Sequence, residues 1–221
     1  MGRIQNGLLG GVSGKVGNVV GCNWKGAPYL RSLPRRSEAP PTEKQIFQRL
    51  KFAILMHFLQ PLLPVLRIGF VPEATMKSAF NAALSYHHKE ALTGVYPALR
   101  LDYPKALISI GNLPGSDAVL AESALAGKIR MSWAPHLAEG NARSNDIVML
   151  ALVNEETHYA FTLLDAGNRA DGSVIVTLPI QYIGTRFHGY VAFRNRTAAL
   201  TNHSGMNTLS TSQYAGGVML I

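Results

Sequence analysis

The sequence contains a single cysteine, Cys22, among its 221 residues. An internal disulfide is therefore excluded, so the fold must be held together by apolar burial and hydrogen bonds. Charged residues are also scarce, at 15 %, whereas hydrophobic residues make up 47 %. This composition excludes a disordered polyelectrolyte and provides a core for one large domain or two small ones.

Long uninterrupted hydrophobic runs are missing too. The most apolar window, 52–71, is broken by Pro61, Pro64 and Arg67, so we predict that it belongs to the core and is not a membrane span. The N-terminus has Arg3 before a glycine-rich stretch that is too interrupted for the apolar part of a signal peptide. We therefore expect a location in the cytoplasm, or within a released particle or extracellular assembly.

Motifs for catalysis, cofactors and metals are not found. The glycine and lysine at 14–15 do not complete a phosphate-binding loop, because Leu9 stands where its first glycine belongs and Val16 replaces its hydroxyl residue. His87 and His88 are adjacent, and adjacent side chains on a helix diverge by roughly 100°, so the two cannot share one metal ion. The sequence therefore predicts a protein that is not an enzyme and has no cofactor or metal site.

Positive charge is concentrated near the N-terminus. Residues 1–55 contain nine Lys or Arg residues and two acidic residues, a surplus of seven, whereas the rest of the chain contains twelve basic and eleven acidic residues. A basic region joined to a nearly neutral body indicates an arm that meets an anionic partner, or a solvated surface.

The N-terminal region, 1–41, is predicted to be an extended basic arm and linker. Its valines at 16–20, and then the segment 24–30, fit two short strands with a turn at Lys25-Gly26. A two-stranded hairpin is marginal alone in water, so it needs a sheet or another subunit to rest on. The proline-marked segment 32–41 is typical of an extended linker.

A helical hairpin is predicted over 42–95. Thr42 and Gln45 form a capping box, and apolar residues recur at helical spacing from Ile46 to Phe58. A second helix is expected over 74–92, after a proline-rich apolar connection at 62–72.

The remaining segment, 96–221, has the pattern of short alternating strands separated by turn residues. We predict strands at 106–111, 118–125, 128–133, 146–154, 157–163, 173–178 and 186–194, with a last strand in 205–212 or 217–221. This pattern indicates an antiparallel β-sandwich of the immunoglobulin or fibronectin type, and Trp133 at the end of one strand fits it. The predicted fold class is therefore α+β.

Eight residues of the basic N-terminal part are predicted to contact another subunit or a polyanion. Their basic and aromatic side chains suit a protein interface as well as a phosphate backbone. We expect the arginines to meet carboxylates of a neighbouring subunit, while a solvated arm stays an alternative. The residues are Lys15, Trp24, Lys25, Tyr29, Arg31, Arg35, Arg36 and Arg49.

Five short motifs resemble a known family. They are S-G-K-V-G-x-V-V (13–20), W-K-G-x-P-Y-x-R-S-x-P (24–34), P-T-E-x-Q (41–45), Q-R-x-K-F (48–52) and G-N-L-P-G (111–115). Together they are similar to an uncharacterised Bacteroidota family, a domain of unknown function. The N-terminal pattern also resembles segments of hypothetical proteins from phages and mobile elements. The resemblance implies family membership and transfers no catalytic residues.

The sequence therefore predicts a non-enzymatic, self-assembling structural subunit of a filament, tube or virion-like particle. Its partner would be another copy of itself, contacted through the N-terminal arm. The first alternative is a nucleic-acid-binding protein that uses the basic region. The second is a hydrolase that uses Cys22 or a histidine.

Overall fold

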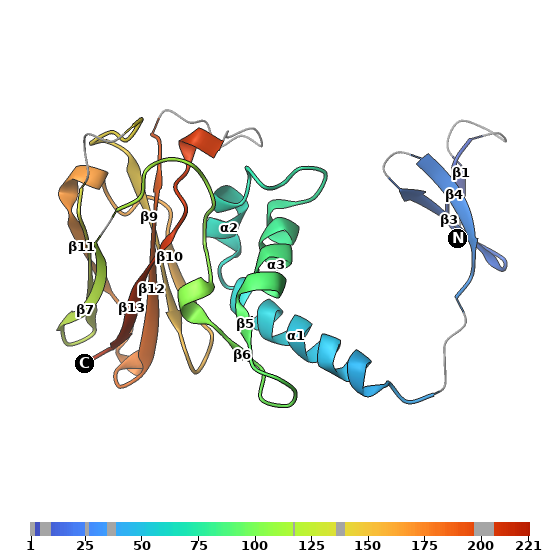
Figure 1. Ribbon diagram of the computed structural model, residues 1–221, viewed down its shortest axis with the longest axis horizontal. Coiled ribbons are helices and arrows are strands. Elements are labelled where there is room, and N and C mark those ends of the chain that lie inside the picture. Colours follow the sequence, from blue (N-terminus) through green and yellow to red (C-terminus); the bar gives the residue numbers. More distant parts are fainter. Residues whose placement is uncertain are drawn as a thin grey trace. The chain divides into compact units, whose positions relative to one another are not determined.

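The computed structural model describes residues 3–4, 10–24, 27–34, 39–116, 118–135, 140–196 and 206–221. It divides the chain into two compact units, Met1–Thr42 and Glu43–Ile221 (Figure 1). We call Met1–Thr42 the N-terminal unit and Glu43–Ile221 the body. The domain boundaries at 41 and 95 stay predictions, and each unit is described by itself.

The N-terminal unit is a small antiparallel sheet. Its strands are β1 (Arg3–Ile4), β2 (Val12–Val16), β3 (Val19–Trp24) and β4 (Ala27–Ser32), in this order across the sheet. Gly17, with φ of 57°, lies in the tight turn between β2 and β3, where a left-handed backbone favours glycine. The two predicted strands therefore belong to a four-stranded sheet.

The body begins with a layer of three helices, α1 (Glu43–Leu59), α2 (Leu63–Gly69) and α3 (Ala79–Glu90). The predicted connection at 62–72 is wrong in part, because it contains α2. Pro64 is compatible with that helix since it lies in the first turn, where no backbone N–H is needed. The second predicted helix is shorter than expected and starts after Ser78, whose side chain accepts a hydrogen bond from the Asn81 N–H at 3.2 Å.

Two antiparallel sheets follow, and they confirm the predicted α+β class and β-sandwich. One sheet has the order β11-β8-β7, and the other has the order β10-β9-β12-β13. As in immunoglobulin-like sandwiches, the first, second and fifth strands share one sheet and the third, sixth and seventh share the other, but the fourth strand, β10, pairs with the third, β9. The strands are β7 (Val119–Leu125), β8 (Lys128–Trp133), β9 (Ile147–Asn154), β10 (Ala160–Leu163), β11 (Ser173–Thr177), β12 (Arg186–Arg194) and β13 (Gln213–Met219).

The body has three layers, a helical layer and two sheets (Figure 1), and two hydrophobic cores. Between the sheets, Met131 and Trp133 of β8 pack with residues such as Leu150 of β9 and Phe193 of β12. The opposite face of β9 and β12 packs against the helices, for example through Tyr190. Both central strands are therefore covered on two sides, which explains why β9 is a continuous apolar run.

The predicted strand at 106–111 is not a strand. It is a buried connecting segment whose polar groups pair with the chain near the C-terminus: the Ile108 N–H donates to Ser212 Oγ at 2.8 Å, and Ser109 Oγ donates to the Ser210 carbonyl at 2.8 Å. The last strand, β13, begins between the two positions that the sequence suggested and overlaps the second of them, 217–221. Periodicity alone could not show that serine side chains replace a β ladder here.

Two smaller elements complete the body on its helical side. The short strands β5 (Leu92–Thr93) and β6 (Arg100–Leu101) pair with each other, and the 3-10 turn η1 (Tyr103–Lys105) follows them. Among the described residues no single helix is long and apolar enough to cross a membrane. Taken together, α1 and α2 have the length and the apolar composition of a membrane-spanning segment, but they are bent by 93° at the break between them.

Candidate functional site

The register of the N-terminal sheet places three of the predicted contact residues on one face. Lys15 of β2 pairs with Val20 of β3, and Val20 pairs with Arg31 of β4. Directly opposite residues in an antiparallel sheet point to the same side, and so do residues two apart in a strand, which adds Tyr29. Lys15, Tyr29 and Arg31 are all exposed, and we call these three residues the basic face.

The other side of the same sheet carries Val16, Val19 and Leu30, which we call the apolar face. These side chains are 55 %, 39 % and 61 % exposed. Gly21 is the only residue of the N-terminal unit that is buried, among those whose burial is described. A Cβ atom at Gly21 would collide with the Val12 carbonyl, so the start of β2 covers only this small part of the sheet.

The other predicted contact residues do not all join this sheet. Trp24 ends β3, where its backbone pairs with Ala27. Arg49 lies exposed on α1 and therefore belongs to the body. The last three predicted contact residues, Lys25, Arg35 and Arg36, lie outside the described residues.

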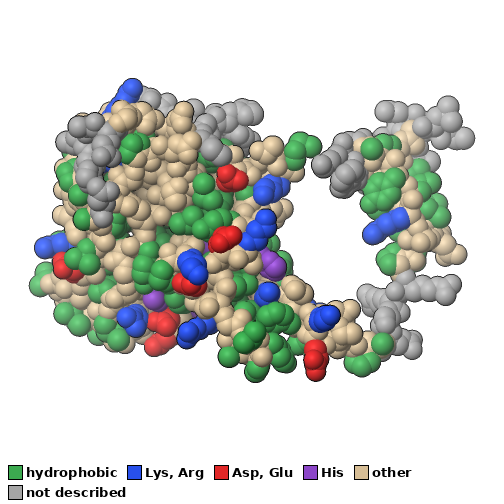
Figure 2. Space-filling model, in the orientation of Figure 1, with side chains coloured by type: hydrophobic (Ala, Val, Ile, Leu, Met, Phe, Trp, Pro, Cys, Tyr) green, Lys and Arg blue, Asp and Glu red, His purple; other side chains and the backbone are tan. Residues whose placement is uncertain are grey.

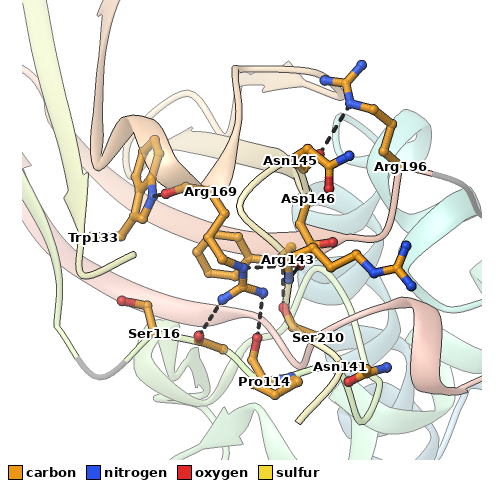
Figure 3. A network of polar contacts seen from close by, with 12 residues as sticks. Pro114, Ser116, Trp133, Asn141, Arg143, Asn145, Asp146, Arg169, Arg196 and Ser210 are labelled. Carbon is orange, nitrogen blue, oxygen red and sulfur yellow. Dashed lines mark hydrogen bonds and ion pairs between the residues drawn. The ribbon is translucent and has the colours of Figure 1, made fainter. Parts of the chain in front are cut away.

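A buried ion pair lies at the centre of a polar network in the sandwich (Figure 3). Nε of Arg169 lies 3.2 Å from Oδ2 of Asp146, and both side chains are fully buried. The guanidinium also donates to the carbonyls of Pro114 and Gly115 at 2.7 and 2.9 Å, and it lies 3.9 Å above the ring of Phe193. No part of Arg169 reaches solvent, and its hydrogen bonds join the segment at Pro114 and Gly115 to Asp146.

A second polar cluster lies at the surface of the body, in a cavity of about 640 Å³ that we call the His188 cavity. The ring of His188 is stacked on Tyr103, with centroids 3.6 Å apart and planes 8° from parallel. Its Nδ1 lies 2.8 Å from the Tyr214 hydroxyl, and its Nε2 lies 3.4 Å from Oε2 of Glu155. The lining residues are Ile54, Thr93, Leu99, Arg100, Leu101, Asp102, Tyr103, Pro104, Glu155, His158 and His188.

Burial sets the protonation of this cluster. It lowers the pKa of His188, an effect that the Glu155 carboxylate partly offsets. Burial also lowers the pKa of His158, and the neighbouring His57 adds to this shift. The pKa of Tyr103 is raised to about 12, first by burial and then by Glu155 and Tyr214. At neutral pH the two imidazoles are therefore neutral and the Tyr103 phenol is protonated.

The sequence matches the family of unknown function DUF6266 over residues 11–205, which is most of the chain. The chain belongs to this family. The predicted membership of an uncharacterised family is thereby confirmed, while the links to Bacteroidota and to phages stay predictions. No curated protein matches the chain.

The residues of the His188 cavity were missed when this DUF6266 sequence was considered alone. Glu155, His188 and Tyr214 are far apart in the chain and meet because β12 pairs with both β9 and β13. Tyr103 joins them from η1, where its ring stacks on His188. The sequence contained one indication of this site. His188 and Tyr190 are two residues apart in a predicted strand and therefore lie on the same face, so a polar side chain occupies a buried face of the strand. Within the described parts of the chain, no three His, Cys, Asp or Glu side chains converge to hold a metal ion.

Proposed function

We propose that the protein is a non-enzymatic structural subunit that assembles with copies of itself through its N-terminal unit. The observation that carries this proposal is a sheet without a core. Its apolar face is exposed, and Gly21 is the only buried residue among those described in the unit. Figure 2 shows hydrophobic side chains at the surface of this unit.

Such a sheet is too small to be stable alone. Domains below about 40 residues usually need disulfides, metals or oligomerisation, and the sequence has one cysteine. Complete burial of a Val or Leu side chain is worth about 1.5–3 kcal/mol, and each side chain of the apolar face, which is 39–61 % exposed, would gain roughly half of this on burial. A second protein surface is therefore the natural source of stability.

A second copy of the chain provides that surface in two ways. Two apolar faces can stack on each other, because the same residues of both copies then meet across a two-fold axis and close a dimer. Alternatively, β4 lies at the edge of the sheet and can pair with a strand of the next copy. Repeated edge pairing does not close, and it would build the filament or tube that the sequence suggested.

Size-exclusion chromatography with light scattering tests this proposal. The double variant Val19→Glu and Leu30→Glu places two charges on the apolar face, and we expect it to be monomeric under conditions in which the full wild-type chain is oligomeric. The matched control places the same charges on the body, at Leu125 and Ile180, which are also exposed. If the control loses the oligomer and the N-terminal variant keeps it, the proposal is wrong.

The basic face supports a second candidate function, binding of a nucleic-acid backbone. Lys15 and Arg31 lie on either side of Val20 on three adjacent strands, and Tyr29 lies on the same face. Proteins that bind single-stranded nucleic acid combine basic side chains, which contact the phosphates, with aromatic rings, on which the bases stack. Such binding weakens as salt is added: a plot of the logarithm of the binding constant against the logarithm of the salt concentration has a slope of roughly −0.7 per phosphate contacted. The variant Lys15→Gln with Arg31→Gln would abolish such binding and leave an assembly through the apolar face intact.

A further inference from the structure

Strand β11 forms a free edge of the sandwich, on the side of the body opposite the helices (Figure 1). Just before this strand, the Gly172 carbonyl accepts a hydrogen bond from the Trp133 N–H at 2.8 Å. Just after it, the Leu178 N–H donates to the Gly127 carbonyl at 2.8 Å. Backbone groups alternate in direction along an antiparallel strand, so those of three exposed residues point away from β8. These residues are Ser173, Ile175 and Thr177.

The outward N–H and carbonyl groups of these three residues have no partner among the described residues. Such an edge can pair with another strand, and proteins usually protect edges with charge, proline, a bulge or short length. The other edges of the sandwich have these features. Strand β10 has only four residues, β7 carries Glu122 and a register shift, and β13 has a register shift against β12. Strand β11, with the sequence SVIVT and an uninterrupted register, has none of them.

The edge of β11 is complementary to itself, because its residue types are symmetrical about the central Ile175. A valine lies on each side of this isoleucine, and a hydroxyl residue lies at each end. Antiparallel pairing centred on Ile175 places it opposite Ile175 of a second copy, and places Ser173 opposite Thr177. All three outward-facing residues then form hydrogen-bonded pairs with two bonds each, related by a two-fold axis. Any other register loses at least one of these pairs.

The side chains on both faces of the sheet are compatible with this pairing. On the outer face, Arg130 lies beside Ile175 in the register, and Glu122 lies beside Arg130. The Arg130 residues of the two copies are then three strand spacings apart, roughly 14 Å, which exceeds the Debye length of about 8 Å. On the inner face, the half-buried Val174 meets the buried Val176 of the other copy, so the apolar core continues across the junction.

We propose that β11 pairs with β11 of a second copy, so that two three-stranded sheets join into one continuous sheet. The contact is small and has to offset the lost translational and rotational freedom of two molecules. It therefore forms at a higher protein concentration than the assembly through the N-terminal unit. With both contacts each copy holds two neighbours and the assembly grows as a chain, a step that rests on the function proposed above.

Two cysteine variants test the register of the pairing. Full-length Ser173→Cys and Thr177→Cys chains are mixed and mildly oxidised, and mass spectrometry of the linked peptides separates their disulfides from any that involve Cys22. The pairing places the Cα atoms of these two positions about 5.5 Å apart, within the range that a disulfide spans. In either variant alone the equivalent cysteines are about 14 Å apart, so we expect at least about tenfold more linkage in the mixture. No links, or equal linkage in all three samples, would overturn the proposal.

The variant Ile175→Lys tests the strength of the pairing. It places two like charges opposite each other on the two-fold axis, at a side chain that is 46 % exposed and so tolerates the change. The matched control is Leu120→Lys, at a 50 % exposed side chain on the other edge of the same sheet. Light scattering over a concentration series should show that Ile175→Lys needs about tenfold more protein to associate, while the control behaves like the wild type. Equal curves for the two variants would contradict the pairing.

The same measurement separates this proposal from the assembly through the N-terminal unit. In the Val19→Glu and Leu30→Glu background, raising the protein concentration should still produce a dimer, and adding Ile175→Lys should abolish it. A background variant that stays monomeric at every concentration and forms no mixed links would refute the β11 pairing alone. A background variant that assembles like the wild type, and loses its assembly on adding Ile175→Lys, would refute the N-terminal assembly and support the β11 pairing.

Discussion

Strands β9 and β4 are opposites within one chain. Every residue of β9, in the middle of the sandwich, is buried, whereas every residue of β4, at the edge of the N-terminal sheet, is exposed. Both strands pair with their neighbours in regular antiparallel ladders. The difference lies in what covers them, because a second sheet and three helices enclose β9, whereas the described residues of the N-terminal unit form no comparable layer over β4.

This contrast shows that backbone pairing and burial are separate contributions to stability. Hydrogen bonds give the N-terminal sheet its geometry, but their net contribution is small because water competes for the same groups. The body adds two apolar cores, and burial is the dominant favourable contribution to folding. The body should therefore be stable on its own, while the N-terminal unit should depend on its partner.

The largest expected effect is in the buried network of the body. Arg169→Met removes the partner of Asp146 and leaves a buried charge unpaired, which costs about 3–5 kcal/mol of unfolding free energy. Urea denaturation measures it. Arg130→Met, at an exposed position of β8, is the control and should change stability by less than about 0.5 kcal/mol. Equal effects would mean that the network does not support the body.

The next effect compares two positions of the same helix. Leu55 of α1 is fully buried, whereas Phe52 is 52 % exposed. Leu55→Ala should therefore destabilise the body by about 2–5 kcal/mol, while Phe52→Ala should cost less than about 1 kcal/mol. Thermal denaturation of both variants gives the comparison. A larger loss for Phe52→Ala would show that the exposed face of α1 around Phe52 is covered in solution.

A third effect concerns pH and is also confined to the body. Burial lowers the pKa of His87 to about 4, below the value of about 6.5 for an unfolded chain. The unfolded state therefore binds more protons between these values, so His87 lowers stability as the pH falls, by at most about 1.4 kcal/mol per pH unit. Its contribution is constant above pH 6.5 and again below pH 4.

Denaturation at several pH values checks this prediction. His87→Gln should flatten the dependence between pH 6.5 and 4, although His158 and His188, whose pKa values are also lowered by burial, keep part of it. His88→Gln, at an exposed neighbour, is the control and should retain the wild-type slope. An unchanged slope in His87→Gln would contradict the buried neutral imidazole.

The smallest effect is expected in the N-terminal unit. Leu30→Ala should leave the unfolding free energy of the dilute, monomeric protein within about 0.5 kcal/mol of wild type, since the side chain is 61 % exposed. The same variant should weaken the oligomer, seen by light scattering over a concentration series. A loss comparable to that of Leu55→Ala in the monomer would mean that the N-terminal unit has its own core.

The sequence was sufficient for the fold class because the strand pattern of the body is regular. Predicted strands such as 173–178 and 186–194 lie within a residue of β11 and β12. It was insufficient for segment 106–111, which resembles a strand in composition but pairs with serine side chains. The sequence identified the helix α1 but not how much of its apolar face is buried. Only Leu55, Phe58 and Leu59 are buried, because only this end of the helix packs in the core shared with the sheet.

The candidate sites differ in the same way. The basic face could be anticipated because Lys15, Tyr29 and Arg31 are close in sequence, although only the register shows that they share a side of the sheet. The His188 cavity could not be anticipated, since its residues come from α1, the β5–β6 segment, η1, the β9–β10 turn and β12, which meet only in the folded body. Local sequence patterns predict helices and strands, whereas a site made by residues that are distant in the sequence can be found only when the topology of the fold is known.

Hydrogen–deuterium exchange of the full chain at several concentrations tests the central claim most directly. At high concentration we expect slow exchange in peptides covering β2, β3 and β4, because another copy protects them. On dilution these peptides should exchange rapidly while peptides from β9 and β12 keep their protection. Protection of the N-terminal peptides that does not change with concentration would contradict the account, because the N-terminal unit would then be stable without a second copy.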